Sequence, residues 1–463
     1  MTRIYRRLWR AATHKPLLAT ETRSHSRQHV TASVVLLYAS TLSGGAIAEG
    51  SQHITLTKPT VLPSSHGNNG VDGQGSGNDR NGGQGSTAYQ VTSPFPETPM
   101  RSPLSINGRV MGGNGGLGVN GGNGGNGGDA INGDHFFLFN EKNAILSCGY
   151  GGFGGIGDVS SIGGLGGNGG NAINGNHLLI HNQRAAQILG GSGSFGGDGD
   201  HGYVESGEGG DGGKGGNAIL GDNLMILNTG DGAKIAGGNG GAAGYGGFSA
   251  TAQGGNGGNG GQGGDAIHGD GLTAIHLDGA SIVGGNGGYG GNGAHSHQGK
   301  HGDGGNGGNG GHAIYGSNLT IINSGEISMG LGGSAGKSYA SDGGNGQAGT
   351  DGAAIYAMGG HNQLTLNSGS HIRGNIILAR STPSQSNTLT IHSNSDSTVQ
   401  GGLILGNASH LTLSGNQPLT LQGDAQFAAG SSLTLTGDGY RDGWLSAHHI
   451  GFNQTKISIQ NPI

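Results

Sequence analysis

This chain has little of what stabilises a compact globular protein. Hydrophobic residues make up 31% of its 463 residues, charged residues 10% and aromatic residues 5%, and there is one cysteine, Cys148. A single thiol forms no internal disulfide, and we read Cys148 as a small apolar residue at a strand end. The low hydrophobic content argues against one large packed core. The low charge argues against a charge-expanded disordered chain, and ten prolines are too few for collagen.

Glycine is what the chain has in excess, with 112 residues, and its distribution is periodic. Glycine-rich stretches run into the dipeptide Ala-Ile six times, and the alanines of these pairs are Ala130, Ala172, Ala218, Ala266, Ala313 and Ala354. Successive pairs are separated by 42, 46, 48, 47 and 41 residues. A period of this size is typical of stacked repeats, in which each unit buries its apolar face against its neighbours.

The first half of each repeat has the pattern of a short β-strand. Leu319, Ile321 and Asn323 alternate with Thr320 and Ile322, and related repeats carry the same alternation. Glycine or asparagine flanks each strand, where turns need positive φ. Such short strands are stable only when they stack. The sequence therefore predicts an all-β fold, a parallel β-helix or β-solenoid with aligned interior columns of leucine and isoleucine.

The second half of each repeat is Gly-Gly-X, as in residues 254–264. Its period of three matches the three residues per turn of polyproline II. Paired runs surround a polar tip, for example 284–293 and 302–311, so we expect antiparallel glycine hairpins whose backbones bond to one another. Because aromatic X residues are concentrated in the outward arms, we also expect one layer to bury its X face. The alternative is a disordered low-complexity linker.

The N-terminus has the features of a secretory signal peptide. Seven basic residues precede an apolar stretch that begins at Thr31, and a small-x-small site follows at Ala46 and Ala48, which predicts Glu49 as the first mature residue. Loss of residues 1–48 removes seven of 21 basic and one of 27 acidic residues, so the mature charge is 14 − 26 = −12. This acidic balance argues against a nucleic-acid partner.

The first 25 residues also resemble a known family. Met1-Thr-Arg-Ile-Tyr-Arg-Arg-Leu-Trp-Arg10, followed by Ala19-Thr20-Glu21, is similar to the extended signal peptide region of type V secretion, which precedes the passengers of autotransporters and two-partner adhesins of Gram-negative bacteria. The resemblance implies two export partners, the Sec machinery and an outer-membrane β-barrel. It also implies a location at the cell surface or outer membrane.

The C-terminal part continues with strand cores but without glycine arms. Leu364, Leu389, Leu411, Leu433 and Ile457 follow one another at 25, 22, 22 and 24 residues, a spacing that resembles the rungs of a passenger β-helix. No segment with the alternation of a transmembrane barrel comes after them. We therefore expect the barrel on another polypeptide, or the chain to be a fragment, with a periplasmic location if the barrel is absent.

These patterns divide the chain into four parts. They are an extended signal peptide (1–48), a leader or N-terminal cap (49–105), six glycine-rich repeats (106–379) and passenger-type β-helix rungs (380–463).

Motifs that carry chemistry are weak. Asp129 and Asp265 each fit one calcium-binding nonapeptide, but a calcium roll needs tandem copies, and a turn-capping role is the alternative. His295, His297 and His301 share one hairpin tip and could offer imidazoles to zinc, or form a solvated polar loop. A phosphate-loop-like stretch at Leu331–Ser338 lacks its first glycine and a following helix.

We therefore expect no cofactor, no metal and no catalytic residues. The predicted function is that of an exported, non-catalytic cell-surface passenger, active in adhesion or surface display through many weak contacts with host or bacterial surface glycans or proteins. Two alternatives stay open. One is a polysaccharide-acting β-helix enzyme, which would need acidic and basic side chains aligned along one solenoid face; the sequence does not show that Asp351 and Arg373 converge. The other is a glycine-bundle module that binds ice or glycan.

Overall fold

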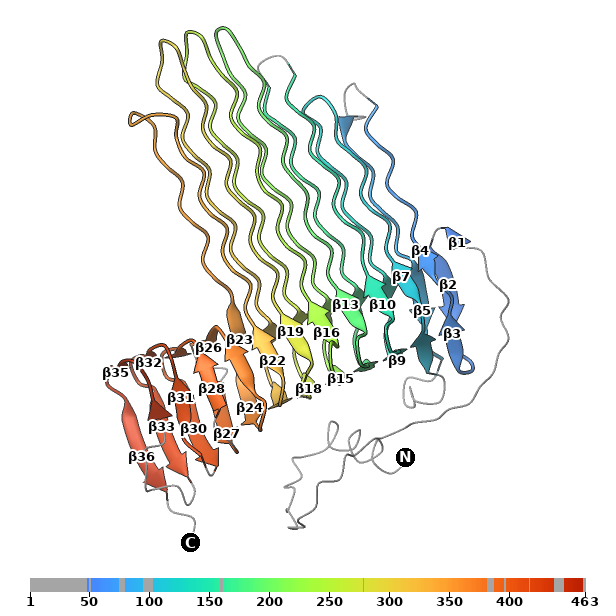
Figure 1. Ribbon diagram of the computed structural model, residues 1–463, viewed down its shortest axis with the longest axis vertical. Helices are drawn as coiled ribbons and strands as arrows, with labels where there is room; N and C mark the ends of the chain where they lie inside the picture. The colour runs from blue at the N-terminus through green and yellow to red at the C-terminus, as the bar shows by residue number, and fades with distance from the viewer. Residues whose placement is uncertain are drawn as a thin grey trace. The chain divides into compact units, whose positions relative to one another are not determined.

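The computed structural model describes residues 48–49, 51–74, 80–94, 103–158, 161–277, 279–380, 387–394, 397–415, 417–436 and 445–460. All of them belong to one compact unit that begins at Ile47. Within these residues the protein contains 36 strands and no helix. The strands form three parallel sheets of 12 strands each, and every turn of the chain adds one strand to each sheet (Figure 1). The predicted parallel β-solenoid is confirmed.

The first sheet holds β1 (Ala48–Glu49), β4 (Ser65–His66), β7 (Arg109–Met111), β10 (Ile145–Ser147), β13 (Gln187–Leu189), β16 (Lys234–Ala236), β19 (Ser281–Val283), β22 (Glu326–Ser328), β25 (His371–Arg373), β28 (Ser397–Gln400), β31 (Leu419–Leu421) and β34 (Leu445–Ser446). The second sheet holds β2 (Gln52–Thr55), β5 (Tyr89–Thr92), β8 (Ile131–Asn132), β11 (Ile173–Asn174), β14 (Ile219–Leu220), β17 (Ile267–His268), β20 (Ile314–Gly316), β23 (Ala353–Ala357), β26 (Asn375–Leu378), β29 (Leu403–Leu405), β32 (Ala425–Phe427) and β35 (Ile450–Phe452). The third sheet holds β3 (Thr60–Leu62), β6 (Leu104–Ile106), β9 (Phe137–Asn140), β12 (Leu179–Asn182), β15 (Met225–Asn228), β18 (Thr273–His276), β21 (Thr320–Asn323), β24 (Gly360–Leu366), β27 (Asn387–Ser393), β30 (His410–Gly415), β33 (Ser432–Thr436) and β36 (Lys456–Gln460).

The core is built from columns of aligned apolar residues. In the second sheet the isoleucines of the Ala-Ile pairs stack in register, as Ile173 does between Ile131 and Ile219. In the third sheet Ile226 lies beside Ile180, and both are buried. Each side chain leaves water only because the next rung covers it, so burial depends on stacking rather than on any single strand.

Glycine arms leave the solenoid at one corner, between a strand of the first sheet and the next strand of the second (Figure 1). The outward and return arms are 67–74 and 80–87, 112–119 and 122–129, 149–157 and 163–171, 190–199 and 207–217, 237–247 and 254–265, 284–294 and 302–312, and 330–337 and 343–352. In the later rungs the same corner is short, as between Arg373 and Asn375. The arms stack into two layers, which we call the wing.

The first arm pair lies within 49–105, the segment that the sequence suggested to be a leader or cap. There Tyr89 takes the place of the repeat isoleucine and pairs with Ile131, while Ala88 is fully buried before it. Strands β2 to β6 in this segment already belong to the second, third and first sheets. The stacked architecture therefore starts earlier than the Ala-Ile pairs indicate.

The structure gives the register of the strand cores that the sequence only spaces. Leu364 pairs with Ile391 and Leu389 with Asn362, whereas Leu389, Leu411, Leu433 and Ile457 pair in succession. A shift of two residues keeps the same side chains facing inward, so the alternation pattern alone does not fix the choice.

Within the wing, the three backbone N–H groups of a Gly-Gly-X triplet can be bonded in three different ways, as residues 257–259 show. Gly257 donates to the carbonyl of Asp303 in the next return arm (2.9 Å), and Gly258 donates to the carbonyl of Gly244 in its own outward arm (3.1 Å). The N–H of Asn259 donates to Oδ1 of Asp211 in the previous return arm (2.6 Å). Asparagine and aspartate are therefore frequent at X, because their side-chain oxygen accepts the N–H of the X residue in the next arm.

The two layers touch backbone to backbone. A Cβ on Gly257 would clash with the carbonyl oxygen of Gly291 in the next outward arm, and one on Gly258 would clash with that of Gly210 in the previous return arm. No space is left between the layers for side chains, so X residues point outward on both. The expectation that one layer buries its X face was wrong: Tyr289 of an outward arm is 65% exposed, and Asn259 of a return arm is also exposed.

At the two ends of the wing, where no further arm packs, residues with side chains replace one glycine of the triplet. In the first outward arm the second position of the triplet is Asn68 or Val71, and in the last return arm the first position is Ala348 or Asp351. In interior arms these positions hold glycine, because a Cβ would meet the adjacent arm. At the last arm pair, Oδ1 of Asp351 instead accepts the N–H of Gly332 (2.8 Å). Side chains thus cap the wing.

Candidate functional site

The predicted signal cleavage site lies at the start of the described chain. Ala46 falls outside the described residues, whereas Ala48 and Glu49 form β1 and pair with Ser65 and His66. Cleavage after Ala48 would remove the first residue of this strand. The cleavage site stays a prediction.

The carboxylates considered for calcium are engaged with the backbone. Oδ1 of Asp129 accepts the N–H of Asn171 (2.7 Å), and Oδ2 lies 3.2 Å from Nδ2 of Asn174. Burial raises the pKa of Asp129. Oδ1 of Asp265 accepts the N–H of His312 (2.7 Å). These side chains belong to one ladder at the strand entry, which fits the turn-capping alternative.

Two of the three histidines at the hairpin tip meet: the rings of His295 and His301 lie edge to face with centroids 4.9 Å apart. The ring of His295 stacks on Phe248 at 5.7 Å and meets Tyr339 edge-on at 4.8 Å. Nδ1 of His301 lies 2.7 Å from Oδ1 of Asp342. His297 is exposed. No group of three or more metal-capable side chains occurs anywhere in the described ranges.

The residues considered for an enzymatic groove do not converge. Nη1 of Arg373 lies 3.4 Å from Oε1 of Glu326 in the neighbouring strand, on the first sheet. Asp351 lies in the wing cap and accepts the N–H of Gly332. The stretch 331–338 that resembles a phosphate loop is the last outward arm, with Leu331 53% exposed.

Cys148 is fully enclosed and has a structural role. Its Sγ lies 3.2 Å from the carbonyl oxygen of Leu189 in the next rung. Burial raises the pKa of this thiol far above its usual range. The side chain is therefore a protonated donor inside the stack.

One surface carries exposed apolar side chains that packing within the protein does not account for. It covers the outer side of the outward arms. Eight apolar X residues gather there, each between 42% and 65% exposed, and we call this surface the aromatic face. Its members are Leu117, Tyr150, Phe153, Ile156, Phe195, Tyr245, Tyr289 and Leu331. Half-exposed aromatic residues in one patch, on a fold that could have placed asparagine there, indicate a binding surface.

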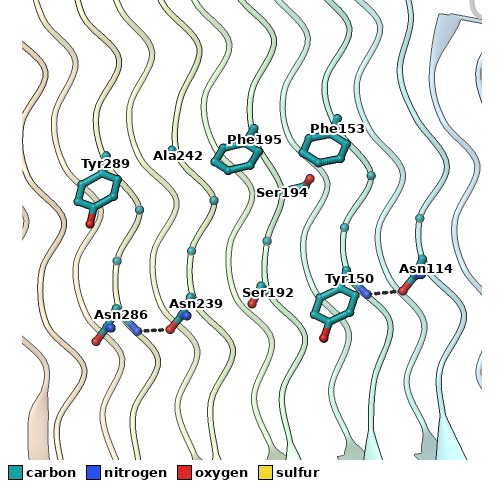
Figure 2. A pocket seen from close by; sticks show the side chains of 18 of the residues that line it. Asn114, Tyr150, Phe153, Ser192, Ser194, Phe195, Asn239, Ala242, Asn286 and Tyr289 are labelled. Carbon is teal, nitrogen blue, oxygen red and sulfur yellow. Dashed lines mark hydrogen bonds between the residues drawn. The ribbon is translucent and has the colours of Figure 1, made fainter.

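The register of the arms brings these residues together from positions 36 to 47 apart in sequence. Tyr150 lies beside Asn114 of the neighbouring outward arm, and the N–H of Tyr150 donates to Oδ1 of Asn114 (2.9 Å). One triplet further along each arm, Phe153 and Phe195 stand side by side with ring centroids 5.5 Å apart and planes 9° from parallel. In Figure 2 the rings of Phe153 and Phe195 lie in one row with Ala242 and Tyr289.

A shallow depression of about 660 Å³ occupies the middle of the aromatic face. Tyr150, Phe153, Phe195 and Tyr289 line it, and Ala242 opens a gap in the row of rings (Figure 2). The polar side chains in its lining are Asn114, Ser192, Ser194, Asn239 and Asn286. None of the lining residues is charged.

The comparisons give no family. The sequence matches no protein-family model, and a search of the curated proteins finds no match. A function for this chain must therefore be inferred from its own chemistry.

The asparagine side chains in the depression use their oxygen atoms in hydrogen bonds within the wing and leave their nitrogen atoms available. Oδ1 of Asn239 accepts the N–H of Asn286 (2.9 Å), and Oδ1 of Asn286 accepts the N–H of Leu331 (2.8 Å). Within the described residues their Nδ2 groups have no protein partner. Each ladder bond also fixes the side-chain rotamer, so the Nδ2 donors are pre-positioned at the surface.

The opposite side of the wing has a different character. The X residues of the return arms are mostly polar, for example Asn168, Asp211 and Lys214, with Leu165 as an apolar exception at 47% exposure. The sequence revealed this asymmetry between arms. It did not reveal that the apolar side is exposed, nor that Leu117, Asn239, Ala242 and Asn286 share the surface; only the inter-arm register shows that.

No helix in the described part of the chain has the length and apolar character of a bilayer span.

Proposed function

We propose that this chain is an exported, non-catalytic surface protein of the type V passenger kind, whose wing acts as an adhesive binding surface. The observation that carries the proposal is the aromatic face. Its rings are exposed on a scaffold whose interior backbone N–H groups are bonded between arms, so the surface is pre-formed. The extended N-terminal region supports export.

The solenoid supports this role by setting the wing's geometry. Each arm continues from strands held in register by three sheets, so the X residues repeat with the rungs. A surface that repeats in this way suits a ligand that repeats as well, since many weak contacts combine into a stable attachment. The rungs without arms, from β25 onward, act as the stem of the passenger.

Export is tested by expressing the full chain in a Gram-negative host. We expect mature protein that begins at Glu49, determined by N-terminal sequencing, and loss of processing when Ala46 and Ala48 are both replaced by Leu. We expect protease-accessible protein at the surface only when a type V outer-membrane barrel is co-expressed. Efficient surface exposure in a host without any such barrel would contradict the secretion route.

Adhesion and the absence of catalysis are tested on the purified chain. Beads coated with it should attach to bacterial or host cells, and beads coated with albumin should not. Incubation with soluble polysaccharides should release no new reducing ends. Release of reducing ends at a rate proportional to protein concentration would support the enzymatic alternative instead.

A further inference from the structure

We propose that the depression on the aromatic face is a binding site for an uncharged polysaccharide. The sugar rings would pack on Phe153, Phe195 and Tyr289, and the hydroxyl groups would accept hydrogen bonds from Asn239 and Asn286. This inference rests on the proposed binding function and names its ligand class.

The aromatic rings form a platform of suitable geometry. Phe153 and Phe195 stack within 9° of parallel with centroids 5.5 Å apart, so the two rings offer a ligand one continuous apolar surface. Tyr289 lies two arms beyond Phe195, about 10 Å away at an inter-strand spacing of about 4.8 Å. Figure 2 looks onto the row and shows the rings presenting their faces to the viewer. The face of an aromatic ring is its electron-rich side, which attracts the weakly positive C–H groups of a sugar ring.

The gap at Ala242 adds a recess to the platform. The methyl group of Ala242 stands between Phe195 and Tyr289, both more than half exposed (54% and 65%). A larger side chain at this position would continue the row of rings. The recess therefore lets a sugar ring descend toward the arm, where Ser192 and Asn239 lie one triplet closer to the solenoid.

The polar groups match hydroxyl-rich ligands. Because Oδ1 of Asn239 and of Asn286 already accepts a backbone N–H, each amide is held with its two Nδ2 donors available to a ligand. A sugar hydroxyl can accept such a bond while its ring packs on the adjacent aromatic side chain. A mixed lining of rings with a few fixed polar groups is the usual composition of a small-molecule site.

Charge and backbone chemistry disfavour other ligands. The lining has no lysine or arginine, so nothing there would recognise phosphate, sulfate or a nucleic acid. An extended peptide binds a sheet by adding a strand to free backbone groups. In this part of the wing the glycine N–H groups are already bonded, as those of Gly240 and Gly241 are to Asn286 and Gly213. The backbone groups left for a ligand include single N–H groups of X residues such as Asn239 and Ala242, for which no acceptor occurs among the described residues. Recognition would therefore use mainly the side chains.

The test uses the purified full-length chain and a panel of neutral polysaccharides: cellulose, xylan, mannan, laminarin and dextran. Binding is measured by co-sedimentation with the insoluble members and by affinity electrophoresis with the soluble ones. Dextran sulfate serves as the charged comparison, and phosphatidylcholine vesicles serve as the apolar one. We expect retention by at least one neutral polysaccharide, unchanged by added salt.

Two variants locate the site. The triple replacement Phe153→Ala, Phe195→Ala and Tyr289→Ala should weaken binding by about ten-fold or more, because each stacked ring contributes to the total. Asn286→Asp keeps the acceptor for Leu331 and removes the Nδ2 donors, so it should weaken binding several-fold without unfolding the wing. Leu165→Ala, on the opposite layer at similar exposure, is the matched control and should bind like the parent.

The outcomes are separable. Loss of binding in both variants, with circular dichroism unchanged and Leu165→Ala unaffected, supports the proposal. Failure to bind every neutral polysaccharide, or equal binding by the triple variant, overturns it. Preferential binding to vesicles also overturns it. If coated beads still adhere to cells in those cases, the proposed adhesive function stands and only the ligand class is wrong.

Discussion

Nδ2 of Asn228 lies 3.2 Å from Nδ1 of His276, and both residues are fully buried in the third sheet. Nε2 of the same imidazole lies 3.0 Å from the carbonyl oxygen of Glu326. An amide Nδ2 can only donate, so Nδ1 accepts and Nε2–H donates, which is the neutral ring. His276 takes the place held by Asn182 and Asn228 in the preceding rungs.

This arrangement predicts acid sensitivity. Burial lowers the pKa of His276 to about 4, whereas the unfolded chain titrates near 6.5. As the pH falls through this interval the unfolded state binds a proton that the folded state does not, so stability decreases with falling pH. The loss from this residue between pH 7 and pH 4 is on the order of 3 kcal/mol. His181, whose pKa burial also lowers to about 4, acts in the same direction.

The measurement is chemical denaturation at a series of pH values, comparing the parent with His276→Asn. The replacement restores the ladder residue of the neighbouring rungs and removes the titrating group. We therefore expect a shallower loss of stability between pH 6.5 and 4. A variant with the same pH profile as the parent would show that His276 does not titrate in this way.

A second prediction concerns close packing in the wing. Gly258→Ala places a methyl group against the carbonyl oxygen of Gly210 in the neighbouring return arm, so these two arms must separate locally. We expect a destabilisation of several kcal/mol, at the upper end of overpacking effects, seen as a lower melting temperature and protease cleavage within the arms. Gly451→Ala is the control, because a Cβ there meets nothing within 4 Å. Equal stability of the two variants would refute the close-packed wing.

A third prediction concerns the X ladder. Oδ1 of Asn306 accepts the N–H of Gln347 (2.8 Å). Asn306→Leu removes this acceptor and should cost about 1 kcal/mol, the usual net value of one hydrogen bond. Asn306→Asp keeps the acceptor and should be close to neutral. Urea denaturation of both variants distinguishes them, and an equal effect would mean that the side-chain acceptor is unimportant.

A fourth prediction concerns the wing cap. Asn345, Ala348 and Asp351 occupy positions that are glycine in interior return arms, and Asp351 covers the N–H of Gly332. Replacing all three with Gly exposes a flat backbone edge like that of an unprotected strand. We expect concentration-dependent self-association by sedimentation velocity, while the parent does not self-associate through this edge. A triple variant indistinguishable from the parent would show that these residues do not protect the edge.

Much of this architecture could be predicted from local sequence. The alternation around Ile321 predicts a β-strand, and the three-residue period of 254–264 predicts polyproline II. The regular succession of these two kinds of segment predicts stacked repeats. The position of the aromatic face could not be predicted. The pattern shows that outward arms carry aromatic X residues such as Tyr289 and return arms carry polar ones such as Asn259, but it does not show which side of each layer is exposed to solvent. The first arm pair was also missed, since Tyr89 replaces the isoleucine that marks the other repeats.

The sequence by itself determined the rungs and the glycine hairpins, because each depends on steric rules that act residue by residue along the chain. Only the tertiary structure decided that both X faces look outward, that Phe153 meets Phe195, and that Asn228 meets His276. Those relationships join residues more than 40 positions apart. They depend on which neighbouring backbone each N–H group bonds to, and that choice is made only when the rungs stack.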